Sequence, residues 1–219
     1  MKVILNPKKE TWSKILERPT KTVAAIEATV SKIFNEVQQT GDKAVNTYTQ
    51  QFDKVQLASN LVSKEEIENA ANNVSESLKS AIHTAYSNIS KFHEAHKTSK
   101  VVVETTNGVQ CWQEKRPIQK VGLYIPGGTA PLFSTVLMLA IPAQIAGCKE
   151  IVLCSPPNSE GEINPAILYT ANLCGVTKII KVGGIQAVAG LTFGTATIPE
   201  VYKIFGPGNQ FVTVAKQLA

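Results

Sequence analysis

Residues 120–131 read KVGLYIPGGTAP and decide the fold, because an apolar run of strand length ends there in a Pro-Gly-Gly turn. A helical pattern follows over residues 132–146, and the same alternation then repeats. Further short apolar runs lie at residues 151–154, 178–182 and 202–205, with helical patterns between them at residues 164–174 and 186–193. Strands that recur every ~25–30 residues with intervening helices are typical of βαβ units. We therefore predict an α/β fold with a parallel sheet.

The first hundred residues have a different, helical pattern. Apolar residues recur there at three- and four-residue spacing along two stretches, Val23, Ile26, Val30, Ile33, Phe34 and Val37, and then Val45, Tyr48 and Phe52. Ser63 with Glu66 three residues later predicts a capping box at the start of a further helix. Asn72-Asn73 and Ser75 are expected to split that helix in two.

A β-hairpin is predicted between the two patterns. Asn107-Gly108 lies between the apolar runs 101–103 and 109–112, and this dipeptide supplies the positive φ values of a tight turn. The hairpin extends the N-terminal helical region to residues 1–116 and leaves the parallel-sheet segment at residues 117–219. The chain lacks a low-complexity linker, so we expect the two segments to pack together.

Composition excludes several classes of function. Hydrophobic residues make up 43% of the chain and charged residues 18%, as in an ordinary globular protein, and the apolar run 136–146 is too short to span a membrane. The net charge of +5 comes from scattered Lys and Arg, which argues against nucleic-acid binding. Four cysteines without a CxxC pair are expected to be free thiols. We expect a cytoplasmic protein.

The ends of the predicted strands carry the candidate binding residues. The strands lead into Pro126-Gly127-Gly128-Thr129-Ala130-Pro131, Ser155-Pro156-Pro157, Gly183-Gly184 and Gly206-Pro207-Gly208-Asn209. Ligands of open parallel sheets bind at this edge, where glycines and helix N-termini suit a phosphate. Tyr124, Gln186 and Asn209 are the polar candidates there. As alternatives, the glycines form tight turns only, Tyr124 covers the sheet edge and Asn209 caps a helix.

The residues for oxidation chemistry are missing from the same edge. Oxidation of an alcohol needs a base or a Lewis acid, yet the segment after residue 117 has no histidine and no aspartate. His83, His93 and His96 lie in the helical region, where His93 and His96 could pair on a metal but more simply form a solvated face. Cys154 has no histidine nearby in sequence to activate it. We assign no catalytic and no metal residue to the chain.

The motifs together resemble histidinol dehydrogenase, most closely over residues 117–215. The similar stretches are residues 120–138, 145–148, 153–157, 182–187 and 203–209. The resemblance implies an incomplete Rossmann-like domain at 117–219 that binds NAD through Tyr124, Gln186 and Asn209. It also implies an NAD- and zinc-dependent homodimer that oxidises L-histidinol to L-histidine through L-histidinal with two NAD.

The resemblance further implies that the chain matches roughly the first half of the family. Residues 1–116 would then belong to a larger domain completed by a C-terminal half, and the zinc ligands and the catalytic base would lie outside this chain. Residues 209–219 predict a helix without a terminating signal, so we expect a truncated fragment that is inactive alone, with a frayed natural C-terminus as the alternative. A non-catalytic nucleotide-binding or regulatory module, and a structural protein without a ligand, are the competing functions.

Overall fold

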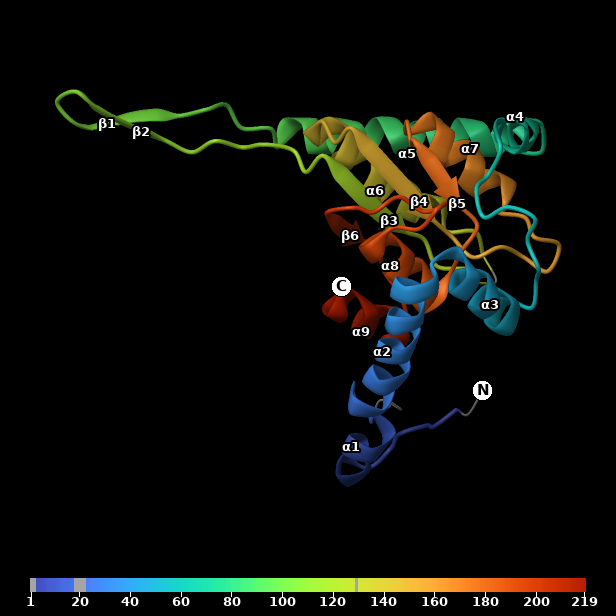
Figure 1. Ribbon diagram of the computed structural model, residues 1–219. Coiled ribbons are helices and arrows are strands. Elements are labelled where there is room, and N and C mark those ends of the chain that lie inside the picture. The colour runs from blue at the N-terminus through green and yellow to red at the C-terminus, as the bar shows by residue number, and fades with distance from the viewer. Residues whose placement is uncertain (1–2, 18–22, 129) are drawn as a thin grey trace.

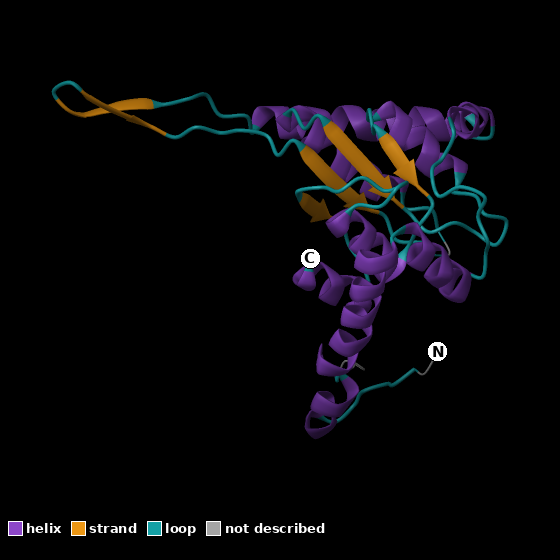
Figure 2. Cartoon of the chain, viewed as in Figure 1, coloured by secondary structure: helices purple, strands orange, loops and turns teal. Residues whose placement is uncertain are grey.

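A parallel sheet forms the centre of the chain (Figures 1 and 2). The computed structural model describes residues 3–17, 23–128 and 130–219, so Thr129 and the side chain of Val23 lie outside the described residues. The sheet has the order β5-β4-β3-β6 and consists of β3 (Lys120–Tyr124), β4 (Glu150–Cys154), β5 (Lys178–Ile180) and β6 (Lys203–Phe205). Each neighbouring pair is parallel, which confirms the predicted fold class.

The helices of this segment connect consecutive strands. They are α6 (Phe133–Ala146), α7 (Pro165–Leu173) and α8 (Gly184–Phe193), and α9 (Gln210–Leu218) follows β6. The predicted elements therefore agree with the structure to within about two residues at each end. After β3 the chain moves outward through β4 to β5 and then returns to place β6 on the other side of β3. That reversal between β3 and β6 is the position at which open α/β sheets form a ligand crevice.

The sheet separates two hydrophobic cores. Side chains alternate along a strand, so Leu123 of β3 and Leu153 of β4 enter one core, while Tyr124 and Cys154 enter the other. The core that contains Tyr124 includes residues of α2 (Val23–Thr40), α3 (Asp42–Asp53), α8 and α9. The opposite core includes residues of α4 (Lys64–Asn72), α5 (Glu76–Ala95), α6 and α7. Both cores therefore contain residues from before and after position 117.

The N-terminal helices begin and end largely where the sequence indicates. The capping box is confirmed, because the Ser63 side chain accepts from the Glu66 N–H and the Glu66 side chain accepts from the Ser63 N–H. The expected split is also confirmed, since α4 ends at Asn72 and α5 starts at Glu76 with Ser75 as its N-cap. A short 3₁₀ turn, η1 (Lys9–Thr11), and α1 (Trp12–Ile15) were not predicted.

The predicted hairpin projects away from the rest of the chain (Figure 1). It pairs β1 (Val102–Thr106) with β2 (Val109–Trp112) in antiparallel register, and every residue of both strands is exposed. No helix within the described part of the chain has both the length and the apolar character needed to cross a membrane.

Candidate functional site

A cleft of about 910 Å³ lies at the carboxyl ends of the central strands. This volume is within the range of roughly 300–1,000 Å³ that is usual for small-molecule sites. The wall combines the loops after β3 and β4 with the starts of α8 and α9 and with parts of α2 and α3. Its residues are Ala25, Thr29, Phe52, Asp53, Tyr124, Pro126, Gly127, Gly128, Pro156, Pro157, Gly184, Ile185, Asn209 and Phe211.

Tyr124, the last residue of β3, connects two of the glycine-rich turns. Its ring is buried in the core beside α8, and its hydroxyl accepts a hydrogen bond of 3.0 Å from the backbone N–H of Gly184. Burial raises the pKa of the Tyr124 phenol, against the lowering effect of this bond, and the phenol therefore stays protonated at neutral pH. That proton takes no part in the bond to Gly184 and can be donated to a ligand in the cleft.

Gly206 brings the loop after β6 against the end of β3. Its φ of +141° is in a region that favours glycine, and a Cβ atom there would lie 2.1 Å from the Tyr124 carbonyl oxygen. Residue 206 therefore has to be glycine for the β3 and β6 turns to form one edge of the cleft.

Gln186 lies directly behind the first residue of α8. Its side chain is 0% exposed, and neither its Nε2 nor its Oε1 has a hydrogen-bond partner. Gly184 has a φ of +63°, and a Cβ atom on it would lie 2.9 Å from Gln186 Oε1. Buried polar groups without a partner are rare in folded proteins and cost about 1–3 kcal/mol each, so this amide is a candidate for contact with a ligand. Gln186 is close to the cleft through Gly184 but does not itself form part of the wall.

Asn209 has the helix-capping role that the sequence left open. It is the N-cap of α9, and its Oδ1 accepts from the Val212 N–H at 3.1 Å. It is also exposed and forms part of the cleft wall. Since capping uses the side-chain oxygen, the amide NH₂ group remains able to donate to a ligand.

Asp53 and Phe52 belong to the same cleft and were not among the sequence candidates. They end α3, which packs against α8 and thereby places the two residues beside the strand ends. Sequence reasoning looked for acid–base residues in the segment after residue 117 and thus missed Asp53 of the helical region. The available signal was an acidic residue in the last turn of a helix, where the helix dipole disfavours negative charge.

The histidines and the cysteine that the sequence analysis considered for chemistry, His83, His93, His96 and Cys154, do not line the cleft. Within residues 3–17, 23–128 and 130–219, no group of three His, Cys, Asp or Glu side chains could hold a metal ion. His83 contacts the Tyr169 hydroxyl at 3.0 Å, and His93 and His96 pack around the ring of Phe92, so the histidines lie on or beside α5 and contribute nothing to the cleft wall. Cys154 is fully buried, which raises the pKa of its thiol and keeps it an inert core residue.

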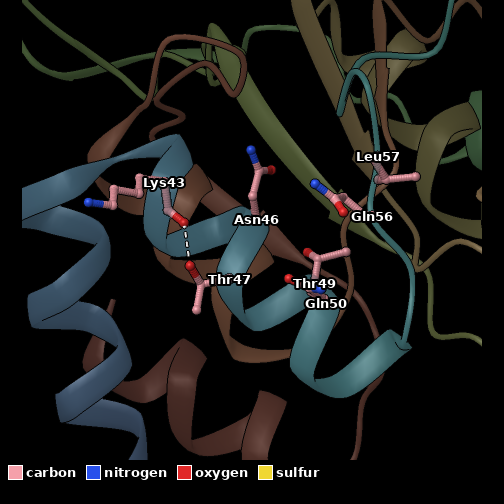
Figure 3. Close-up of a pocket in the computed structure, with 7 residues that line it drawn as sticks. All are labelled: Lys43, Asn46, Thr47, Thr49, Gln50, Gln56 and Leu57. Carbon is pink, nitrogen blue, oxygen red and sulfur yellow. Dashed lines mark hydrogen bonds between the residues drawn. The ribbon is translucent and has the colours of Figure 1, made fainter.

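A second hollow of about 410 Å³ lies beside α3 (Figure 3). Amide and hydroxyl side chains dominate its wall, and its one charged residue, Lys43, points away from the other labelled residues. The hollow therefore offers a ligand fewer kinds of contact than the cleft at the strand ends, which also has aromatic side chains and glycine turns. Its wall consists of Lys43, Asn46, Thr47, Thr49, Gln50, Gln56 and Leu57.

Comparison with known proteins gives one consistent family. The family model described as histidinol dehydrogenase matches residues 16–219. The chain is 56% identical over 218 residues to the histidinol dehydrogenase of Bacteroides thetaiotaomicron, covering 100% of this chain and 51% of that protein. It is 53% identical over 204 residues to the enzyme of Vibrio cholerae, covering 93% of this chain and 46% of that one.

A solved structure agrees with both sequence comparisons. The crystal structure of histidinol dehydrogenase from Elizabethkingia anophelis superposes with a TM-score of 0.89 at 54% sequence identity, covering 97% of this chain and 49% of that one. The chain thus spans about half the length of the curated relatives it matches. On this evidence the chain belongs to the histidinol dehydrogenase family.

Proposed function

We propose that this chain supplies the NAD site of an enzyme that oxidises L-histidinol to L-histidine through L-histidinal. The observation that carries the proposal is the unpartnered amide of Gln186, which lies behind a glycine turn at the edge of a large cleft. The family supports an oxidoreductase of histidine biosynthesis. Bound NAD would accept the hydride, and two NAD would be reduced for each L-histidinol.

Each candidate residue has a role that its contacts allow. Tyr124 would donate its free hydroxyl proton to the cofactor while its oxygen holds Gly184 in place. The backbone N–H groups of Gly127 and Gly128 suit the pyrophosphate, because glycine lets a phosphate approach the main chain closely. The start of α8 adds the positive end of a helix dipole.

Two amides would complete the cofactor site. Asn209 would donate its NH₂ group from the cleft wall while its oxygen caps α9. The Gln186 amide would offer a donor and an acceptor to a ribose or to the nicotinamide carboxamide. Its side chain would first have to rotate to another rotamer that passes Gly184 and reaches the cleft.

Within the described residues, no group of three or more His, Cys, Asp or Glu side chains is placed to hold a zinc ion. We therefore derive no step through a metal here. The proposal assigns the zinc ligands, the catalytic base and the L-histidinol contacts to residues outside this chain. It follows that the 219-residue chain by itself should form no NADH from L-histidinol.

A homodimer is part of the proposal, and the hairpin supports it. A two-stranded hairpin alone is marginally stable in water, yet β1 and β2 expose Val102, Val103, Val109 and Trp112 along a projecting arm. A second subunit could cover these apolar side chains.

Two further proposals concern the whole protein. We propose a domain boundary between residues 116 and 117 and a cytoplasmic location.

The test is an NAD titration of the natural gene product that carries this sequence. We expect saturable binding of NAD, and we expect L-histidinol-dependent NADH formation by that product but not by the 219-residue chain. Turnover by the 219-residue chain with added zinc would contradict our placement of the chemistry. Binding of NAD without turnover by the gene product would favour a regulatory module, which the family does not support.

A further inference from the structure

Pro156 follows β4 and packs against the glycine turns that follow the strands on either side of it. In the sheet order β5-β4-β3, β4 lies between the strands that lead into Gly127 and Gly183. A Cβ atom on Gly127 would lie 2.6 Å from Pro156 Cγ, and a Cβ atom on Gly183 would lie 2.5 Å from Pro156 Cβ. Real Cβ atoms essentially never come so close to another atom. The Pro156 ring therefore fills the space that a side chain at either position would need.

Backbone conformation does not explain why these two positions are glycine. Gly183 has a φ of −111° and a ψ of −173°, which is extended backbone that any residue can adopt. Gly127 does not have a positive φ either, in contrast to Gly184 and Gly206. The contact with Pro156 is therefore the reason that positions 127 and 183 require glycine.

Backbone hydrogen bonds hold the strands together only as far as the start of the turns. The last of them run from the Ile125 N–H to the Cys154 carbonyl at 2.9 Å and from the Ser155 N–H to the Ile180 carbonyl at 3.1 Å. Beyond these bonds, no backbone–backbone hydrogen bond joins the turns after β3, β4 and β5 to one another within the described residues. The spacing of the turns thus depends on side chains, and a proline ring is a rigid spacer because its ring fixes its geometry.

The two turns that Pro156 contacts meet at the cleft. The cleft wall includes Pro156 itself, Gly127, and Gly184, which follows Gly183 directly. The Tyr124–Gly184 hydrogen bond ties the end of β3 to the second turn, and the Pro156 ring fills the gap between the turns from the side of β4. Turns that are held at a fixed separation before a ligand arrives do not have to be ordered when it binds.

We propose that Pro156 is a positioning residue, whose ring fixes the separation of the Gly127 and Gly183 turns so that both can contact one bound cofactor. This inference rests on the proposed NAD-binding function. Pro156 acts through the two turns and needs no polar contact with the cofactor, since proline has no N–H to donate. Such preorganisation is measured as affinity for the cofactor, and the rate of the chemical step should depend on it little.

The experiment exchanges bulk between residues 127 and 156 in the natural gene product. Gly127→Ala presses a methyl group against the proline ring. In Gly127→Ala/Pro156→Ala the nearest side-chain atom of residue 156 would be its Cβ at 3.7 Å, which is an ordinary contact. We expect Gly127→Ala to weaken NAD binding about tenfold and Pro156→Ala to weaken it about fivefold, because both disturb the spacing of the turns. The double variant should bind NAD more tightly than Gly127→Ala.

Pro117→Ala is the matched control for the loss of a proline ring. Pro117 is partly exposed, as Pro156 is, but it precedes β3 and is not part of the cleft wall. Both substitutions give the unfolded chain more conformational freedom, so a general effect of proline removal on stability appears in both variants. Pro117→Ala should leave NAD affinity unchanged, whereas Pro156→Ala should lower it and keep kcat at saturating NAD close to the wild-type value.

The outcomes separate this inference from the proposed function. A wild type that binds no NAD overturns both together. A wild type that binds NAD, with Pro156→Ala unchanged in affinity, overturns the positioning role alone. A double variant that binds NAD no better than Gly127→Ala also overturns it, because the ligand and not Pro156 would then require glycine at position 127. If Gly127→Ala does not fold, the comparison of Pro156→Ala with Pro117→Ala still decides.

Discussion

The hydroxyl of Tyr124 accepts a 3.0 Å hydrogen bond from the backbone N–H of Gly184, so the end of β3 is tied to the start of α8. The two residues are 60 positions apart in the chain. The bond satisfies one of the N–H groups that every helix start leaves free. It also orients the phenol toward a cleft whose wall includes both residues.

Tyr124→Phe should weaken both the fold and the site. The Gly184 N–H would lose its acceptor, which costs about 1 kcal/mol because this donor is only partly buried, and the cofactor would lose a hydroxyl donor. Urea denaturation and NAD titration measure the two effects. Tyr202→Phe is the matched control, because Tyr202 is 66% exposed and no hydrogen bond of its hydroxyl is present among the described residues. Equal effects from both variants would refute a special role for Tyr124.

Gln186→Leu should separate binding from stability. Removing a buried amide that has no partner relieves an unfavourable group, so thermal stability should stay the same or rise. NAD affinity should fall, because the proposed donor and acceptor are lost. Gln186→Ala should also weaken NAD binding, with a loss of stability from the cavity it leaves. Both variants of the gene product should retain their metal content, and loss of metal would remove Gln186 from the cofactor site.

Gly184→Ala should destabilise the start of α8 through two separable effects. An L-residue at a φ of +63° is strained by roughly 1 kcal/mol, and the added Cβ would lie 2.9 Å from Gln186 Oε1. A double-mutant cycle with Gln186→Ala should recover the steric part and leave the backbone strain. Strictly additive changes in unfolding free energy would show that the two residues are not in contact in solution.

Burial raises the pKa of Asp53, and this predicts a pH dependence with a definite sign. Below the ordinary pKa of aspartate, the carboxyl is neutral in both the folded and the unfolded chain and imposes no penalty. As pH rises from that value through the raised pKa, the unfolded chain releases its proton first and Asp53 lowers stability. The stability gain of Asp53→Asn should therefore grow over this window and vanish below it. Thermal denaturation across pH 3–8 provides the measurement, and a gain independent of pH would contradict the assignment.

Much of the fold was predictable because it depends on local pattern. The apolar runs that became β3 to β6, the Ser63–Glu66 capping box and the Asn107-Gly108 turn are all short-range signals. Tyr124 and Asn209 were also placed correctly at the strand-end cleft, since parallel strands bring their carboxyl ends to one edge. Their cofactor contacts stay predictions.

The remainder depends on packing between distant segments. Asp53 and Phe52 enter the cleft because α3 packs against α8, and no spacing rule relates those helices. Gln186 is completely buried next to Gly184, whose positive φ a sequence pattern does not reveal. The α1 helix is too short to produce a helical period.

The central claim is that the cleft at the strand ends is the NAD site, and hydrogen–deuterium exchange with and without NAD tests it most directly. In the natural gene product, NAD should slow exchange in peptides that contain Gly127–Gly128 and Gly184–Gln186. Peptides from the middle of α5, on the opposite side of the sheet, should be unaffected. Unchanged exchange at both glycine turns, with protection instead around the hollow formed by Lys43 and Gln50, would contradict the account.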